Sequence, residues 1–272
     1  MKLLVGSVFV DDSPIQERWL DLQLKFLGAT TEEFEHVVVL WVRQTDAFFK
    51  KTNVIEPKVH YRLSEAHSRG LTYLTYYFSE RMEEFDAFLF LDSDAFPIKK
   101  GWLPELMQAM EPRPVLDHDG VILTQLGNSY EIAAAIRTEN LEQRLHASVL
   151  FVKDRQHLPK LKFPYERRGL DLKGDPEEDI LILPYEDQAR HLAFPLMRSN
   201  RKNVHPLASG VYYDMFYHHC CGSRDFKLRA NEYWQWTLGT GDTSGLTHEL
   251  MADPTKFVSD LAGWSTGRYA CW

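Results

Sequence analysis

The stretch Phe85-Asp86-Ala87-Phe88-Leu89-Phe90-Leu91-Asp92-Ser93-Asp94-Ala95 decides how the rest of the sequence is interpreted. Its apolar run, residues 85–91, predicts a strand buried on both faces of a parallel sheet. The run leads directly into Asp92 and Asp94, which repel each other when buried unless a cation or a proton intervenes. A divalent hard cation such as Mg²⁺ or Mn²⁺ is favoured here over a plain strand-end turn.

Strands alternate with helices on both sides of this stretch. Other strands are expected at residues 2–10, 36–42, 59–63, 121–126, 148–152 and 210–219. Helices are expected at residues 15–27, 70–82, 101–110 and 176–192, and residues 46–58 show no regular pattern. Such alternation is typical of an α/β sheet with crossover connections, in which ligands bind at the carboxyl ends of the strands. The GxGxxG and GxxxxGK[ST] phosphate-binding motifs are missing from the sequence.

Composition limits the class of protein. The 272 residues are 44% hydrophobic, and no Gly/Ser- or Pro-rich linker divides them, which favours one domain. The formal net charge of -8 disfavours a nucleic-acid partner, although a local groove could override it. Three cysteines favour a reducing, cytoplasmic compartment. The N-terminal run is interpreted as a strand and not a signal peptide, and no window is long enough to span a membrane.

The Asp92-Ser93-Asp94 segment resembles the DxD motif of the GT-A fold glycosyltransferases, with no single family assigned. The resemblance covers roughly residues 1–222 and implies a GT-A-like α/β/α sandwich with one mixed, mainly parallel sheet. It further implies a nucleoside diphosphate sugar donor, with UDP favoured, and Mn²⁺ or Mg²⁺ as cofactor. Asp94 would bind the metal directly, and Asp92 would contact the ribose or the metal.

Further donor contacts follow from the same resemblance. Val8, Val10 and Asp11 end the first strand, where GT-A enzymes hold the base and ribose. Ser93 lies inside the motif itself. Arg69, in a basic, glycine-containing segment before the helix, could pair with the diphosphate, and the alternative is a plain helix N-terminus.

The paired histidines His218 and His219 end the late strand. Consecutive strand residues point to opposite faces, so only one of them is expected in the site. GT-A enzymes often use a late-strand histidine followed three residues later by glycine, and His219 with Gly222 has that spacing. His219 is therefore expected as the third metal ligand. Two alternatives are ordinary core histidines and a zinc site with Cys220 and Cys221, although adjacent residues of one strand cannot all reach a tetrahedral ion.

An acidic cluster opens the expected helix at residues 176–192. Asp175 suits an N-cap, and acids in the first turn favour a helix start. In many inverting GT-A enzymes a Glu-Asp pair at such a position supplies the general base, and Glu178-Asp179 resembles that pair. Other families of the fold use a lone aspartate, which would be Asp175. Both are therefore candidate catalytic residues, and the stereochemistry stays open.

These features predict a hexosyl- or pentosyltransferase that moves a sugar to an unidentified hydroxyl acceptor on a glycan, a protein, a lipid-linked sugar or a modified nucleic-acid base. Residues 1–100 would form the nucleotide-sugar half, residues 101–222 the acceptor half, and residues 223–272 a tail without a counterpart. One alternative is a nucleotidyltransferase, which would usually show a Gly-rich loop where only Gly6 is present. The other is a non-catalytic binding module, which would be expected to lose the acids.

Overall fold

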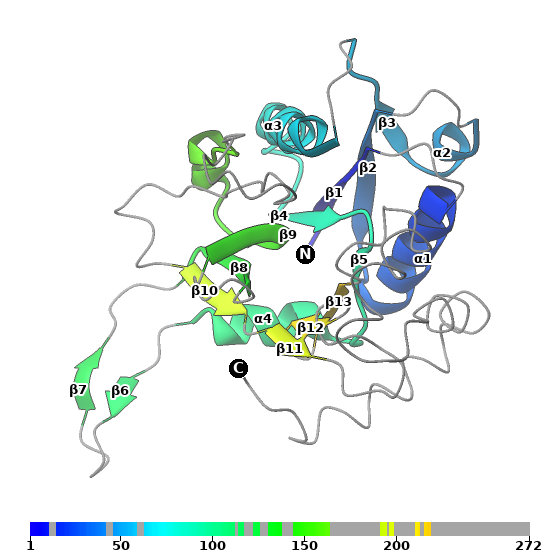
Figure 1. Ribbon diagram of the computed structural model, residues 1–272. Coiled ribbons are helices and arrows are strands. Elements are labelled where there is room, and N and C mark those ends of the chain that lie inside the picture. The colour runs from blue at the N-terminus through cyan, green and yellow to red at the C-terminus, as the bar shows by residue number, and fades with distance from the viewer. Residues whose placement is uncertain are drawn as a thin grey trace, which may run out of the picture.

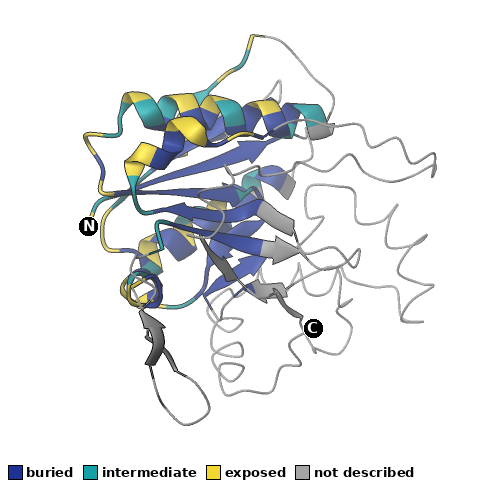
Figure 2. Ribbon diagram, turned by 90° about the vertical axis from the view of Figure 1, so that its left-hand side faces the viewer, coloured by how far each residue is buried: buried dark blue, intermediate teal, exposed yellow. Residues whose placement is uncertain are grey.

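The computed structural model describes residues 1–10, 15–41, 46–58, 63–111, 114–116, 122–125, 130–137, 144–163, 191–194, 196–198, 210–212 and 215–218. Within these ranges, a mixed sheet of seven strands lies between helices on its two faces (Figures 1 and 2). The strands at the centre of the main sheet are buried, whereas the helices turn exposed residues outward (Figure 2). The expected α/β class with a mixed, mainly parallel sheet is thus confirmed.

Four parallel strands make up one half of the main sheet. They are β1 (Leu3–Phe9), β2 (Phe34–Leu40), β3 (Asn53–Ile55) and β4 (Ala87–Asp92), and β1 lies between β4 and β2. Every residue of β1 is buried, as expected for a strand covered on both faces. Because the strands are parallel, the carboxyl ends of β1, β2 and β4 meet at one edge of the sheet, which is called the carboxyl edge below.

The other half of the main sheet contains the antiparallel pairings. Strand β9 (Arg144–Val152) runs antiparallel to β4 and to β8 (Ile132–Arg137), and β10 (His191–Phe194) is parallel to β8. Strands β6 (Pro114–Leu116) and β7 (Ile122–Gln125) form a separate antiparallel pair.

Helices cover both faces and form the core with the alternating strand residues. Helix α3 (Leu63–Glu80) and the 3₁₀ helix η1 (Arg155–Lys160) pack on the face that carries Leu4, Val8 and Phe90. Helices α1 (Ile15–Thr30), α2 (Asp46–Lys51) and α4 (Trp102–Ala109) pack on the other side. The expected apolar stripe of α1 is confirmed at Trp19 and Phe26, which are both buried.

Two glycines allow α3 to lie close to β1. A Cβ atom on Gly6 would come within 2.7 Å of Phe78 Cζ, and one on Gly70 would overlap a methyl group of Val8. Side chains at either position would push the helix away from the sheet. The close packing brings the first turns of α3 to the carboxyl edge.

Four expectations about secondary structure need correction. The segment expected to be irregular, residues 46–58, contains α2 and β3, because Phe48 and the β3 backbone find tertiary partners. Leu63 begins α3 rather than ending a strand, and residues 59–62 lie outside the described ranges. His191 and Leu192 are not helical but lie in β10, paired with β8. The single late strand is two strands, β12 (Gly210–Tyr212) and β13 (Phe216–His218), paired antiparallel.

A second, smaller sheet joins these late strands to the end of β4. Its order is β11 (Leu196–Arg198), β12, β13 and β5 (Ala95–Pro97), and all three pairings are antiparallel. Since β5 follows β4 after two residues, this sheet brings the late part of the chain to the carboxyl edge.

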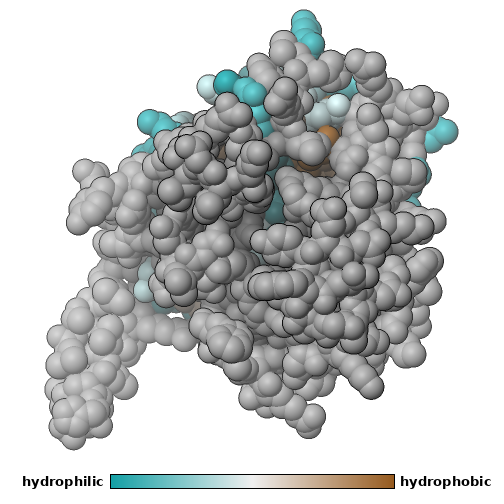
Figure 3. Space-filling model, viewed as in Figure 1, coloured by the Kyte–Doolittle hydropathy of each residue, from teal (hydrophilic) through white to brown (hydrophobic). Residues whose placement is uncertain are grey.

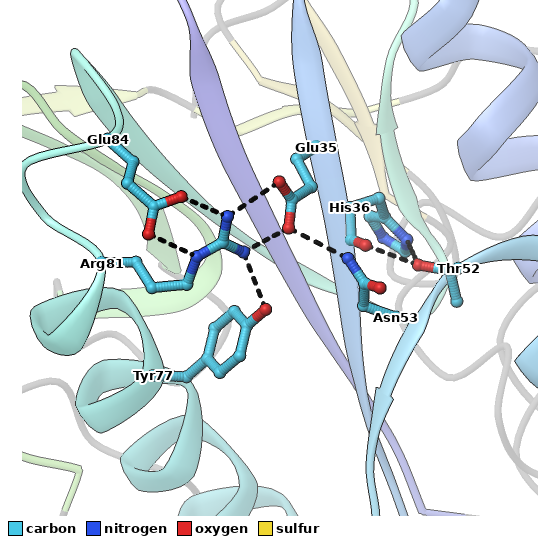
Figure 4. Close-up of polar contacts among 7 residues, drawn as sticks. All are labelled: Glu35, His36, Thr52, Asn53, Tyr77, Arg81 and Glu84. Atoms are coloured by element: carbon cyan, nitrogen blue, oxygen red, sulfur yellow. Dashed lines mark hydrogen bonds and ion pairs between the residues drawn. The ribbon is translucent and has the colours of Figure 1, made fainter.

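The opposite edge of the main sheet, the amino edge, carries a polar network of Glu35, Asn53, Tyr77, Arg81 and Glu84 (Figure 4). Arg81 follows the end of α3 and donates to both carboxylates, including contacts of 3.0 Å from Nη2 to Glu35 Oε2 and from Nε to Glu84 Oε1. These hydrogen bonds, to Glu84 first and then to Glu35, raise the pKa of Arg81. This set of five residues is called the amino-edge network below.

The described surface is largely polar on the face seen in Figure 1. In the space-filling view, the described side chains that reach this face are mostly hydrophilic (Figure 3). No helix among the described residues is both long and apolar enough to cross a membrane.

Candidate metal centre

The acidic pair lies where the main sheet passes into the smaller one. Strand β4 ends at Asp92, Ser93 and Asp94 form a turn, and β5 begins at Ala95. Ser93 and Asp94 are buried, and 14% of the Asp92 side chain is exposed. A buried carboxylate at Asp94 is costly to maintain without compensating groups, so its surroundings define what the site can do.

Helix α1 holds this turn through Gln23, which is fully buried. Its Nε2 donates to the backbone carbonyl oxygens of Asp92, at 2.6 Å, and of Ala95, at 2.8 Å. One side-chain amide therefore spans the turn and ties its two ends together. This contact fixes the backbone from which both acidic side chains project.

The smaller sheet brings a histidine to the acids. Strand β13 pairs antiparallel with β5, so that His218 lies opposite Ala95. Its Nε2 is 3.2 Å from Asp92 Oδ2 and 3.4 Å from Asp94 Oδ1. Asp92, Asp94 and His218 each offer one ligand atom, and these atoms lie within 4.8 Å of one another. These three residues are called the Asp–His cluster below.

The second nitrogen of His218 has its own partner. Tyr212 lies in β12, and its hydroxyl is 2.8 Å from His218 Nδ1. Both side chains are buried. A hydroxyl can accept from Nδ1–H or donate to Nδ1, so Tyr212 supports either tautomer of the ring. When Nδ1 carries the proton, the lone pair of Nε2 faces the two carboxylates, which is the arrangement that a ligating histidine requires.

The Asp–His cluster fits a divalent cation by its chemistry. Carboxylate oxygens suit Mg²⁺ and Mn²⁺, and imidazole suits transition metals, so two carboxylates with one imidazole favour Mn²⁺. The location fits as well, because ligands of open α/β sheets bind beyond the carboxyl ends of the strands. The cluster thus has the ligand chemistry and the position in the fold that suit a divalent cation.

Three of the predicted donor residues, Val8, Val10 and Arg69, lie among the described residues. Val8 is the register partner of Asp92 across the β1–β4 pair, but its side chain is buried beneath Gly70. Val10 follows β1 and is partly buried against the core. Arg69 lies in the second turn of α3, where Nη2 is 3.7 Å from Glu65 Oε1 and the side chain is 55% exposed. A donor role for these residues stays a prediction.

His218 lies in the cluster, whereas the glycine spacing predicted its neighbour His219 as the third ligand. The reason is the β5–β13 register, which no strand periodicity reveals. His219 lies outside the described residues, as do Asp11, Asp175 and Asp179, and so do Cys220 and Cys221 of the alternative zinc site. The roles predicted for them are untested by the structure.

Three residues at the site were not expected from the sequence. Gln23 and Tyr212 act through backbone and ring contacts that carry no motif. His67, on α3, has its Nε2 3.1 Å from Asp92 Oδ1. The sequence offered one signal for His67. It lies three residues before Gly70, the glycine at which α3 approaches β1.

A second group of potential ligands has a structural explanation. Glu131, Asp154 and His157 also have ligand atoms within 4.8 Å of one another. However, His157 Nε2 is paired with Glu131, and Asp154 caps η1 by accepting from the Gln156 N–H at 2.9 Å. Capping is a frequent role for aspartate and accounts for its presence here.

Comparisons with known proteins give structural matches only. No protein-family model and no curated protein matches the sequence. Among solved structures, S. aureus TarS in complex with UDP matches at 14% identity and a TM-score of 0.31, covering 50% of this chain and 35% of that chain. A glycosyltransferase involved in glycosylation of the major capsid of PBCV-1 matches at 14% identity and a TM-score of 0.36, covering 58% and 62%.

The glycosyltransferase GlyE of Streptococcus pneumoniae TIGR4 matches at 14% identity and a TM-score of 0.33, covering 58% of this chain and 35% of that chain. The chain thus spans about a third of the TarS and GlyE chains and less than two thirds of the PBCV-1 chain. At such similarity, the functional argument depends on the site itself.

Proposed function

We propose that the chain is a metal-dependent glycosyltransferase that takes its sugar from a nucleoside diphosphate sugar, with a UDP-sugar favoured. The observation that carries the proposal is the Asp–His cluster at the carboxyl edge. It joins the DxD segment after β4 to a histidine from a strand more than a hundred residues later in the chain. The acceptor hydroxyl and the transferred sugar, hexose or pentose, are left open.

In this proposal, Asp92, Asp94 and His218 would hold Mn²⁺ or Mg²⁺. When bound, the cation supplies positive charge for the leaving diphosphate, as a Lewis acid. Gln23 keeps the Asp92 and Asp94 backbone in place, and Tyr212 orients the His218 ring. Burial of the cluster lowers the local dielectric and would strengthen the attraction between the bound cation and an anionic donor.

The general base is proposed from the sequence alone. Asp179 is preferred, and Asp175 is the second candidate. Loss of a general base typically costs about 10²–10⁴-fold in rate. Asp179→Asn should therefore lose transfer while keeping donor affinity, and Asp175→Asn should be nearly silent because asparagine also caps helices well.

The decisive experiment incubates the protein with a panel of sugar nucleotides and Mn²⁺ and measures release of the nucleoside diphosphate. We expect turnover with a UDP-sugar, its loss in excess EDTA, and its loss in Asp94→Asn, which keeps the size of the side chain but removes the charge. Tyr76→Ala, an exposed change on α3, is the matched control. Full turnover in EDTA would contradict the metal role.

The same assay separates the two alternative functions. A nucleotidyltransferase would release pyrophosphate from a nucleoside triphosphate and a sugar phosphate instead. A non-catalytic module would bind the sugar nucleotide in Mn²⁺ without releasing the diphosphate. Either result would replace the glycosyltransferase proposal.

A further inference from the structure

The Asp92 carboxylate lies between two imidazole rings from different parts of the chain. His218 Nε2 is 3.2 Å from Oδ2, and His67 Nε2 is 3.1 Å from Oδ1. The side chains of His67 and Asp92 are 16% and 14% exposed, so their contact is largely shielded from solvent. One carboxylate oxygen therefore faces the Asp–His cluster, and the other faces α3.

We infer that His67 is a positioning residue that holds Asp92 in the orientation needed to bind the divalent cation. The inference rests on the proposed metal-dependent function. His67 itself is not part of the three-residue group whose ligand atoms lie within 4.8 Å. With the proton on Nε2, its positive charge density attracts Oδ1 across the 3.1 Å contact, and Oδ2 is then kept on the side of Asp94 and His218.

The packing of α3 explains why His67 reaches Asp92. Gly70 lies against Val8, and Val8 is the register partner of Asp92 in the neighbouring strand. Residues three apart on a helix share a face, so His67 lies on the same face as Gly70 and one turn nearer the start of α3. Ser68 also anchors this turn by donating to the Phe163 carbonyl oxygen. The orientation of Asp92 is thus set by a helix packed firmly on the sheet.

A carboxylate fixed in this way loses less rotamer freedom when a cation binds. Groups that orient a metal ligand without touching the metal typically contribute about 10–100-fold to metal affinity. The effect expected of His67 is therefore on Mn²⁺ affinity in the absence of any donor, and it differs from the complete loss expected when a ligand is removed.

The test measures Mn²⁺ affinity from the electron paramagnetic resonance signal of the free ion, without sugar nucleotide. His67→Ala should weaken binding by about 10–100-fold, because Asp92 loses its orienting partner. His67→Gln should restore most of the affinity, because its amide N–H can replace Nε2. Tyr76→Ala, on the exposed side of the same helix, should bind as the wild type does. If His67→Ala does not fold, His67→Met, which has no donor, replaces it.

Four results would overturn the inference. Wild-type affinity in the alanine or methionine variant would show that Asp92 needs no such partner. A loss that glutamine does not restore, as large as that of Asp94→Asn, would make His67 a ligand and not a positioning residue. An equal loss in Tyr76→Ala would show a general disturbance of α3. A wild-type chain without Mn²⁺ affinity, or Asp94→Asn with full affinity, would overturn the metal centre as well, so the two failures are distinguishable.

Discussion

The amino edge and the carboxyl edge of the main sheet both gather charged side chains, but in opposite ways. At the amino edge, the planar guanidinium of Arg81 donates hydrogen bonds to Glu35, Glu84 and Tyr77 (Figure 4). The Arg81 and Glu35 side chains are 22% and 27% exposed. At the carboxyl edge, Asp94 is only 6% exposed, and the Asp92 and Asp94 carboxylates meet imidazole rings. The amino edge pairs opposite charges, which stabilises the fold without any ligand. The carboxyl edge instead brings together potential metal ligands at a position where burying a carboxylate is costly.

Two buried histidines extend the comparison. His36, at the amino edge, contacts two hydroxyls: Thr52 Oγ1 is 3.0 Å from Nδ1, and Ser7 Oγ is 3.5 Å from Nε2. His218, at the carboxyl edge, contacts two carboxylates and a hydroxyl. Burial lowers the pKa of His36 to about 3, so that this ring stays neutral. Both histidines are buried, so burial alone does not identify a functional histidine. The distinguishing feature is the kind of partner, which is a hydroxyl for His36 and a pair of carboxylates for His218.

The largest expected effect is on the free energy of unfolding in Mn²⁺, which should depend on the carboxyl edge and not on the amino edge. At a concentration of about 100 times its Kd, Mn²⁺ should raise the free energy of unfolding by about 2.7 kcal/mol. Asp94→Asn should lose this increment. Arg81→Leu should instead lower the starting stability by about 1–3 kcal/mol, because Glu35 loses its charged partner, and keep the Mn²⁺ increment.

Urea unfolding of the three proteins, with and without Mn²⁺, measures both quantities. If Arg81→Leu also lost the increment, the two edges would be energetically coupled and the separation of roles would be wrong. If Asp94→Asn kept the increment, the cation would bind elsewhere.

A smaller effect should come from the helix that links the two edges. Helix α3 carries His67 near its start, and Arg81 follows its end. Gly70→Ala would overlap Val8 and should cost about 1–3 kcal/mol by overpacking. Because the shift occurs near His67, Mn²⁺ affinity should fall too, while the Arg81 contacts at the far end persist.

Gly28→Ala in α1 is the matched control, since a Cβ atom there meets nothing within 4 Å. It should stabilise the protein by about 0.5–1 kcal/mol through helix propensity and leave Mn²⁺ affinity unchanged. Calorimetry measures the stability of Gly70→Ala and Gly28→Ala, and titration measures their Mn²⁺ affinity. Equal Mn²⁺ affinity in the two variants would show that α3 does not position Asp92.

These two edges also show what could be predicted from the sequence. The apolar runs identified β1, β2 and β4, and the position of Asp92 and Asp94 after one of them located the candidate site, because both signals are local. The partners of the acids were not predictable in the same way. Gln23 and His67 come from helices with ordinary amphipathic patterns, and the choice of His218 depends on the pairing of β13 with β5. Such contacts are set by tertiary packing and register, which periodicity does not encode.

The smallest effect tests the amino-edge histidine through pH. The folded pKa of His36 is about 3, against an ordinary value of 6.5 in the unfolded chain. Above pH 6.5 the ring is neutral in both states, and His36 adds no pH dependence. Below it, only the unfolded state takes up the proton, so stability falls as the pH drops towards the folded pKa. Between about pH 7.5 and about pH 5.5, this loss should be about 1.4 kcal/mol.

His36→Asn removes the titrating group but keeps polar atoms near Thr52, so the change of stability with pH is the quantity to compare, not stability itself. Urea unfolding at the two pH values should show a loss smaller by about 1.4 kcal/mol in His36→Asn than in the wild type. An equal loss in both proteins would mean that His36 accepts a proton in the folded state. The amino edge would then contain a histidine able to carry charge, and partner chemistry would no longer distinguish His36 from His218.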